Sequence, residues 1–163
     1  PTHVNRNPML YKQTIQFALQ GGIIDLTCGM TGSAIPVPQA VKQALDAGVP
    51  LERLTLSSDG NGSMPKFNEN NELIGLTAAA PRYLYEEMLS IVKAGVLPFD
   101  KALQLITCNV ADALKLEDKG RIAVGKDADL IVWNDDLTLN KVFARGRLMV
   151  DEGQAVVKGT FEN

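Results

Sequence analysis

The feature that most limits the possible folds is an alternation of amphipathic helices with short apolar strands in the first part of the chain. Residues 8–19 have apolar side chains at helical spacing and end at a glycine pair, and residues 23–27 follow as a short, mostly apolar strand. Residues 38–47 again have helical spacing, with Gly48 as a C-terminal stop, and residues 53–57 are predicted as the next strand. Because parallel strands need a crossover connection, usually a helix, this order predicts parallel βα units and an α/β fold.

The later part of the chain changes from this alternation to a series of short strands. After a largely polar loop at residues 65–71, the apolar spacing predicts three further helices, over residues 81–93, 100–107 and 110–116. Turn residues then separate three predicted short strands, at residues 130–133, 142–144 and 148–150. We therefore expect two domains: residues 1–119 with the βα units, and residues 120–163 as an all-β unit.

Composition and charge exclude several classes of function. The chain has 163 residues, of which 45% are hydrophobic and 21% charged, as is typical of a globular protein that buries a core. Its formal net charge is −3 and it has no long Lys/Arg run, so nucleic acid is not an expected partner. No apolar run reaches the roughly 18 residues of a membrane span, so no membrane partner is expected either. Cys28 and Cys108 lack zinc-ribbon spacing and are interpreted as buried free thiols, which favours a reducing cytoplasm.

Two segments contain the residue types of a metal-dependent hydrolase. The single histidine, His3, lies in residues 1–7 (PTHVNRN), and Asp59 lies in a glycine-rich turn within residues 57–63 (SSDGNGS). A neutral imidazole and a carboxylate are both good zinc ligands, and the planar guanidinium of Arg6 can bind a carboxylate. This pattern favours a metal hydrolase of acidic substrates, with fewer than the three protein ligands usual for a catalytic zinc. A start without Met inside such a motif predicts that the chain is part of a larger protein.

Several segments resemble one enzyme superfamily. Residues 119–132 (KGRIAVGKDADLIV) resemble the C-terminal segment of metal-dependent amidohydrolases, in which the chain leaves a (β/α)8 barrel and completes a small β-sandwich. Residues 1–7 and 57–63, together with the ending at residues 157–162 (VKGTFE), resemble more specifically the isoaspartyl dipeptidases of that superfamily. The resemblance runs from end to end of the chain. It covers only the C-terminal part of that enzyme, about barrel strands six to eight and the closing strands of the sandwich.

The resemblance implies roles for four residues at the carboxyl ends of barrel strands, where barrel active sites collect. It makes His3 a metal ligand at the end of strand six, and it makes Arg6 a ligand of a substrate carboxylate. Asp59, at the end of strand eight, is implied to be both a metal ligand and the catalytic residue, which takes a proton from the attacking hydroxide and passes it to the leaving amine. Ser63 is implied to help hold the substrate.

The implied reaction is hydrolysis of the β-aspartyl (isoaspartyl) bond of a small dipeptide at two zinc ions, in a cytoplasmic homo-oligomer. Bound metal ions lower the pKa of water from about 15.7 to about 7 and polarise the scissile carbonyl. The family's other ligands are an HxH pair on strand one, a carboxylated lysine or similar bridging group, and a histidine on strand five. None of these appears in this sequence. The resemblance therefore implies that the N-terminal part of the same enzyme is a partner, and that the isolated chain is inactive.

Two other classes of function stay open. A related amidohydrolase acting on a cyclic amide or an aminohydrolase substrate is the first, although Arg6 and Ser63 suit a free carboxylate better. The second is a non-catalytic structural or assembly module, because a partial barrel leaves open sheet edges and exposed helix faces that favour association. Asp127 and Asp129 resemble a carboxylate pair, but they precede a predicted strand without a nearby histidine, so turn and solvation roles are favoured.

Overall fold

The computed structural model describes residues 1–32, 34–70 and 72–159. The chain divides into two compact units, Pro1–Leu114 and Lys115–Asn163. Asn71 of the predicted polar loop and residues 160–162 of the C-terminal motif lie outside the described residues. The assignment of residues 1–119 to a partial barrel and of residues 120–163 to a β-sandwich portion stays a prediction.

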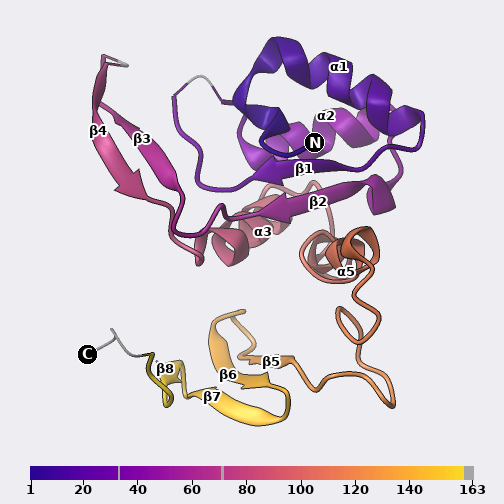
Figure 1. The fold of residues 1–163 in the computed structure, drawn as a ribbon, viewed down its shortest axis with the longest axis vertical. Helices are drawn as coiled ribbons and strands as arrows, with labels where there is room; N and C mark the ends of the chain where they lie inside the picture. Colours follow the sequence, from indigo (N-terminus) through magenta and orange to yellow (C-terminus); the bar gives the residue numbers. More distant parts are fainter. Residues whose placement is uncertain (33, 71, 160–163) are drawn as a thin grey trace. The chain divides into compact units, whose positions relative to one another are not determined.

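The first unit is built on two short parallel strands, β1 (Ile24–Thr27) and β2 (Leu54–Ser57) (Figure 1). The strands pair in register, with Ile24 opposite Leu54 and Thr27 opposite Ser57, so their carboxyl ends lie side by side. The start of the chain is tied to this sheet, because the backbone N–H of Asp25 donates to the carbonyl oxygen of Pro1 at 2.9 Å. The predicted α/β class with parallel pairing is confirmed.

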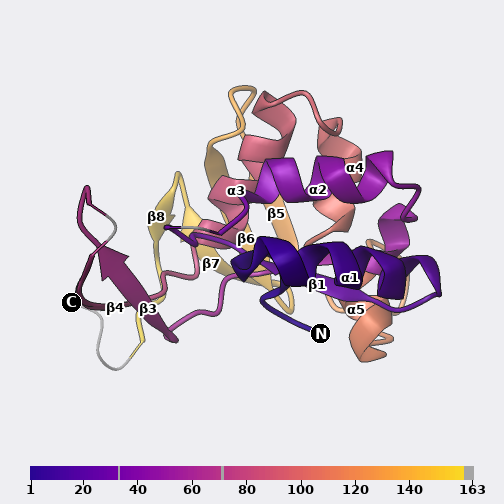
Figure 2. The ribbon, with the colours of Figure 1, turned by 90° about the horizontal axis from the view of Figure 1, so that it is seen from above.

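Helix α1 (Pro8–Leu19) has the bounds predicted from the sequence, and it begins at a clear local signal. Pro8 occupies its first turn, and the side chain of Asn7 accepts hydrogen bonds from two backbone N–H groups of that turn. Helix α2 (Val37–Asp46) ends before Gly48, whose φ of 88° is the left-handed conformation typical after a helix. α1 and α2 both run along β1 (Figures 1 and 2) and are joined by the hydroxyl of Tyr11, which donates to the Ala40 carbonyl at 2.5 Å.

Further helical segments complete the first unit. They are the 3-10 helices η1 (Val4–Arg6) and η2 (Leu51–Arg53) and the α-helices α3 (Tyr83–Lys93), α4 (Phe99–Gln104) and α5 (Cys108–Leu114). All three predicted helices of this region are confirmed in existence, with bounds that differ by a few residues. Propensity locates such elements better than it locates their ends, because the last turns depend on capping and packing.

The two faces of the β1–β2 sheet have different chemistry. Alternate residues on one face are apolar, fully or almost fully buried, and packed in one core with side chains of the helices: Ile24, Leu26, Leu54 and Leu56. The residues between them are polar and belong to the opposite face: Asp25, Thr27, Thr55 and Ser57. The sheet therefore presents an apolar face to the core and a face of hydroxyls and one carboxylate away from it.

The prediction of a polar loop at residues 65–71 is wrong for residues 65–67, which belong to a strand, whereas residues 68–70 lie in the turn that follows. β3 (Ser63–Phe67) and β4 (Leu73–Ala78) pair as an antiparallel hairpin (Figure 1). Asn68 holds the turn, because its backbone N–H donates to the Glu72 carbonyl at 3.0 Å and its side-chain oxygen accepts from two backbone N–H groups beyond it. The prediction failed because the backbone ladder and this asparagine turn organise a segment that has no regular apolar alternation.

The second unit is a four-stranded antiparallel meander. Its strands pair in sequence order: β5 (Leu130–Trp133), β6 (Leu139–Ala144), β7 (Arg147–Asp151) and β8 (Gln154–Ala155). The turn between β6 and β7 has two central residues with positive φ, Arg145 at 49° and Gly146 at 76°, as tight hairpins require. The predicted short strands are confirmed.

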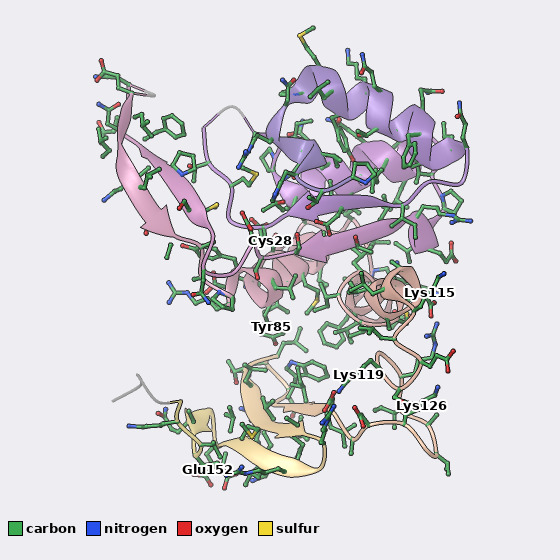
Figure 3. The ribbon with its side chains drawn as sticks, in the orientation of Figure 1. Cys28, Tyr85, Lys115, Lys119, Lys126 and Glu152 are labelled. Atoms are coloured by element: carbon green, nitrogen blue, oxygen red, sulfur yellow. The ribbon has the colours of Figure 1, made fainter. Side chains whose placement is uncertain are left out.

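A cluster of opposite charges precedes β5. The Nζ of Lys119 (Figure 3) forms ion pairs with the carboxylates of Asp127, at 2.6 Å, and of Asp129. The backbone N–H of Arg145 donates to Asp129 at 2.7 Å. The hydrogen bonds from Lys119 hold the pKa of both carboxyl groups below the usual range and raise the pKa of Lys119. This pairing agrees with the structural role favoured from the sequence.

The two cysteines are free, and they differ in environment. Cys28, directly after β1 (Figure 3), is fully buried, and burial together with the nearby negative charges of Glu87 and Asp25 raises the pKa of its thiol. Cys108 is only half-buried, so the prediction of two buried thiols is wrong for this residue. Cys108 is the first residue of α5. In the described parts of the chain, no helix has the length and apolar character needed to cross a membrane.

Candidate active site

His3 is held at the carboxyl end of β1 through its ring. The imidazole Nδ1 lies 2.7 Å from Oγ1 of Thr27, the fully buried last residue of that strand. In the tautomer with its proton on Nδ1, the ring donates to Thr27 and keeps a lone pair on Nε2. The backbone of His3 is left-handed, with φ of 58°, directly before η1. A histidine oriented through one ring nitrogen in this way is suited to bind a ligand through the other.

Asn5 fixes the segment between His3 and Arg6 to the sheet. Its side chain is only 1% exposed, and its Nδ2 donates to the carbonyl oxygens of Thr27, at 3.1 Å, and of Ile35, at 3.2 Å. Its Oδ1 accepts from the backbone N–H of Thr27 at 2.9 Å. Both ends of the amide are therefore satisfied, as buried polar groups require. This side chain therefore fixes η1 against β1, together with the contact of the His3 ring with Thr27.

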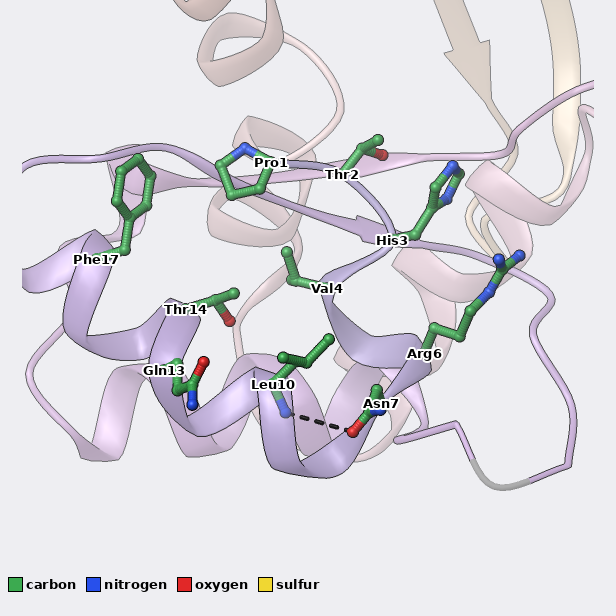
Figure 4. Close-up of a pocket in the computed structure, with 10 residues that line it drawn as sticks. All are labelled: Pro1, Thr2, His3, Val4, Arg6, Asn7, Leu10, Gln13, Thr14 and Phe17. Carbon is green, nitrogen blue, oxygen red and sulfur yellow. Dashed lines mark hydrogen bonds between the residues drawn. The ribbon is translucent and has the colours of Figure 1, made fainter.

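His3 and Arg6 line the same pocket, between the start of the chain and α1. Figure 4 shows their side chains extending to the same side of the backbone. The pocket has a volume of about 580 Å³, and α1 contributes four residues to its wall: Leu10, Gln13, Thr14 and Phe17. The Arg6 side chain is exposed, so its guanidinium is accessible to an anion. Asp59 and Ser63 are not among the residues that line this pocket.

Asp59 lies in a tight turn two residues beyond β2. Its φ is 48°, and its carbonyl oxygen accepts from the N–H of Gly62 at 2.7 Å. A Cβ on Gly62 would lie 2.8 Å from Cγ of Asp59, so only glycine leaves room for this carboxylate. The turn is tied to the chain beyond β4 by the N–H of Asn61, which donates to the Ala79 carbonyl at 2.9 Å. The predicted glycine-rich turn is confirmed. Gly62 lets the backbone pass close to the side chain of Asp59.

The register of the sheet brings the surroundings of His3 and Asp59 to one end. Thr27, which holds the His3 ring, is paired with Ser57, and Asp59 follows two residues later. The backbone N–H of Cys28 also donates to the Ser57 carbonyl at 2.8 Å, which extends the pairing beyond the strands. Ser63 is exposed and begins the hairpin that leaves the Asp59 turn. The catalytic, metal-binding and substrate-binding roles of these residues stay predictions.

A hydrogen-bond network on the polar face of the sheet was missed by reasoning from sequence. Oδ2 of Asp25 accepts from Oγ1 of Thr2 at 2.6 Å and from Oγ of Ser57 at 2.5 Å, and Oδ1 accepts from Oγ1 of Thr55 at 2.8 Å. A signal was available, because the strand sequences IDLT and LTLS both alternate apolar with polar residues. Interpreting them as simple apolar strands concealed a polar face.

The donors in this chain fit a zinc ion in chemistry but not in number. An imidazole nitrogen and a carboxylate are ordinary zinc ligands, and a catalytic zinc usually has three protein ligands. Among the described residues there is no group of three or more His, Cys, Asp or Glu side chains that could hold a metal ion. His3 and Asp59 therefore do not make a complete metal site within this chain.

The chain is similar in structure to a β-aspartyl dipeptidase, as expected from its motifs. The crystal structure of that enzyme from Fervidobacterium islandicum AW-1, in complex with a β-Asp-Leu dipeptide, is 32% identical with a TM-score of 0.84. The similarity covers 98% of this chain and 41% of that chain. The resemblance to isoaspartyl dipeptidases inferred from the sequence is confirmed as a likeness of sequence and fold.

Curated relatives with other names also match part of the chain. An imidazolonepropionase of Anaeromyxobacter sp. (strain K) is 34% identical over 112 residues, which are 69% of this chain and 22% of that protein. Adenine deaminase 1 of Carboxydothermus hydrogenoformans is 28% identical over 104 residues, 63% of this chain and 17% of that protein. The chain thus spans about a fifth of the length of these relatives. Residues 34–152 match the amidohydrolase family, and over this large share of its length the chain belongs to that family.

Proposed function

We propose that this chain supplies part of the active site of a metal-dependent hydrolase that cleaves β-aspartyl (isoaspartyl) dipeptides. The observation that carries the proposal is that the His3 ring is held by Thr27 at the carboxyl end of β1, while Asp59 follows the carboxyl end of β2, which is parallel to β1. Barrel enzymes have their active sites at that end of the strands. The similarity to an enzyme crystallised with a β-Asp-Leu dipeptide supports this class of substrate.

In the proposed site, His3 and Asp59 hold zinc, two ions in the complete enzyme, together with ligands from outside this chain. Zinc supplies a more acidic water and a polarised carbonyl when it is bound. The Nε2 of His3 is the ligand atom, because Nδ1 lies against Thr27. A carboxylate oxygen of Asp59 accepts the proton of the attacking water and passes it to the nitrogen of the leaving amine.

Arg6 and Ser63 are proposed to bind the ends of the dipeptide. The exposed guanidinium of Arg6 lines the same pocket as His3 and suits a carboxylate, which it can bind through two parallel hydrogen bonds. The hydroxyl of Ser63 lies beyond the Asp59 turn, at the first residue of β3. In this proposal Arg6 supplies a cation beside His3, and Ser63 supplies a neutral hydrogen-bonding group four residues after Asp59.

The remainder of the site is proposed to come from the N-terminal part of the same enzyme. The matched part is 41% of the solved β-aspartyl dipeptidase, and the described residues contain no three-ligand metal group. Helix α1 exposes apolar side chains that a packing partner would cover: Met9, at 81% exposure, and Leu10, Phe17 and Leu19. The homo-oligomeric state and the cytoplasmic location implied by the resemblance stay predictions.

The test is hydrolysis of β-Asp-Leu beside α-Asp-Leu, with zinc added. The chain by itself should cleave neither dipeptide. The chain joined to the part of the Fervidobacterium enzyme that it does not match should cleave the β-linked isomer alone. His3→Ala and Asp59→Asn should abolish this activity, while the control Arg82→Ala, which changes an exposed cation paired with Glu86, should not affect it. A joined protein that binds zinc and cleaves neither dipeptide would contradict the proposal.

A second candidate is a ring-directed amidohydrolase, which the similarity to imidazolonepropionase and adenine deaminase favours. The variant Arg6→Ala separates the two. Loss of a charged hydrogen bond worth about 1.5–3 kcal/mol should raise KM for the dipeptide about 10- to 100-fold. Turnover of a neutral ring such as adenine should be unaffected. Faster turnover of adenine or an imidazolone than of β-Asp-Leu would favour the second candidate.

A further inference from the structure

We propose that Asp25 is a positioning residue, whose carboxylate fixes the segment bearing His3 against the segment bearing Asp59. The inference rests on the proposed function, in which those two residues act in one site. It concerns a different residue, on the polar face of the sheet, to which the family resemblance gave no role.

A single oxygen atom of Asp25 joins the two segments. Its Oδ2 accepts from Thr2, the residue before His3, at 2.6 Å and from Ser57, two residues before Asp59, at 2.5 Å. These partners lie 23 and 32 residues away from Asp25 in the sequence. The shared acceptor adds a side-chain link between the two segments, beside the backbone hydrogen bonds that join each of them to β1.

The backbone of Asp25 supports the same arrangement. Its N–H donates to the carbonyl oxygen of Pro1 at 2.9 Å, so one residue holds the start of the chain through both backbone and side chain. One layer closer to the carboxyl ends, Thr27 binds the His3 ring and is paired with Ser57. The side chains of Asp25 and Thr27 both point to the polar face, because strand residues two apart share a face.

The surroundings of Asp25 favour this role over that of an ordinary ion pair. In the described part of the chain its three side-chain partners are hydroxyls, and none of the ion pairs there includes it. Thr2, Asp25, Thr55 and Ser57 all line a pocket of about 470 Å³ on this face. Hydroxyl donors give a carboxylate short, directional, charge-assisted bonds. Such bonds hold geometry well without the bulk of a lysine or arginine.

The chain offers a matched control for the test. Thr2→Val and Ser57→Ala each remove one bond to Oδ2, whereas Thr55→Val removes the bond to Oδ1, which comes from a residue of β2 two positions further from Asp59 than Ser57. All three variants lose one hydroxyl from the same carboxylate. If Asp25 only stabilises the sheet, the three should behave alike; if it positions the site, Thr55→Val should differ from the other two.

The first measurement uses the chain itself. His3 is the single histidine, so its ring signals in an NMR spectrum need no assignment. Thr2→Val should weaken the nuclear Overhauser effect between the His3 ring and the Thr27 methyl and should speed hydrogen exchange at the residue 25 amide at least about tenfold. Thr55→Val should change neither. Equal changes in both variants, or none, would overturn the inference even if the proposed reaction is wrong.

The second measurement uses the chain joined to the rest of the enzyme. Misplacement of reacting groups by about 1 Å costs about 100-fold in rate, so Thr2→Val and Ser57→Ala should lower kcat about 10- to 100-fold with KM almost unchanged. Asp25→Asn, which keeps the shape and one acceptor, should retain more activity than Asp25→Ala. Thr55→Val should keep the parent kcat. A loss of kcat in Thr55→Val equal to that in Ser57→Ala would refute positioning, whereas absence of dipeptide cleavage in the unsubstituted protein would refute only the proposed function.

Discussion

Replacement of Asn5 by alanine is expected to be the most destabilising polar substitution in the first unit. The buried amide makes three hydrogen bonds: its Nδ2 donates to the carbonyls of Thr27 and Ile35, and its Oδ1 accepts from the Thr27 N–H. Each such bond contributes about 0.5–1.5 kcal/mol, and a buried partner left without one costs about 1–3 kcal/mol. Because the Thr27 N–H loses its side-chain acceptor, we expect Asn5→Ala to lower the free energy of unfolding by about 3–5 kcal/mol.

The control for this substitution is Asn7→Ala. Asn7 is also an asparagine whose side chain binds backbone N–H groups, but it is an exposed cap of α1, and loss of such a cap costs about 1 kcal/mol. Urea unfolding followed by circular dichroism at the helical band reports on the first unit, because every helix of the described residues lies there. If Asn5→Ala costs no more than Asn7→Ala, the argument that one buried amide fixes η1 to β1 is refuted.

Three further outcomes are expected. Gly29→Ala should destabilise the first unit by more than the about 1–2 kcal/mol that a left-handed backbone costs a non-glycine residue, since the new Cβ would lie 2.4 Å from the Tyr83 ring. The control is Gly95→Ala, because Gly95 has a similar φ and open space around it, and this variant should show the backbone cost alone in the same urea assay. Cys28 should react with a thiol reagent only on unfolding, because it is buried and its pKa is raised, whereas the other cysteine should react in the native protein. Lys119 holds the pKa of two aspartates below the usual range, so their contribution to stability is present above the ordinary aspartate pKa and is lost as pH falls through the lowered values. The thermal midpoint of unfolding can be followed by the fluorescence of the single tryptophan, which lies in β5. This midpoint should fall more between about pH 5 and pH 2 in the parent protein than in Lys119→Gln.

Local chemistry explains why much of the fold was predictable. The bounds of α1 follow from Pro8 and the Asn7 cap at one end and a glycine pair at the other, all within a few residues of the helix. The end of α2 follows from Gly48, and the last two turns of the meander follow from Gly146 and Gly153, because glycine accepts positive φ. Where the signal was not local, as in the β3–β4 hairpin, the prediction failed, because cross-strand pairing stabilised a segment without apolar alternation.

The candidate site divides in the same way. By itself, the sequence determined which residue types are available: one histidine beside an arginine, and an aspartate in a glycine-rich turn. Only the tertiary structure decided that Thr27 orients the His3 ring and that Asn5 fixes η1. It also decided that Asp25 joins the start of the chain to the end of β2. These contacts span more than 20 residues of sequence, and they exist because the parallel register aligns strand ends that no local pattern relates.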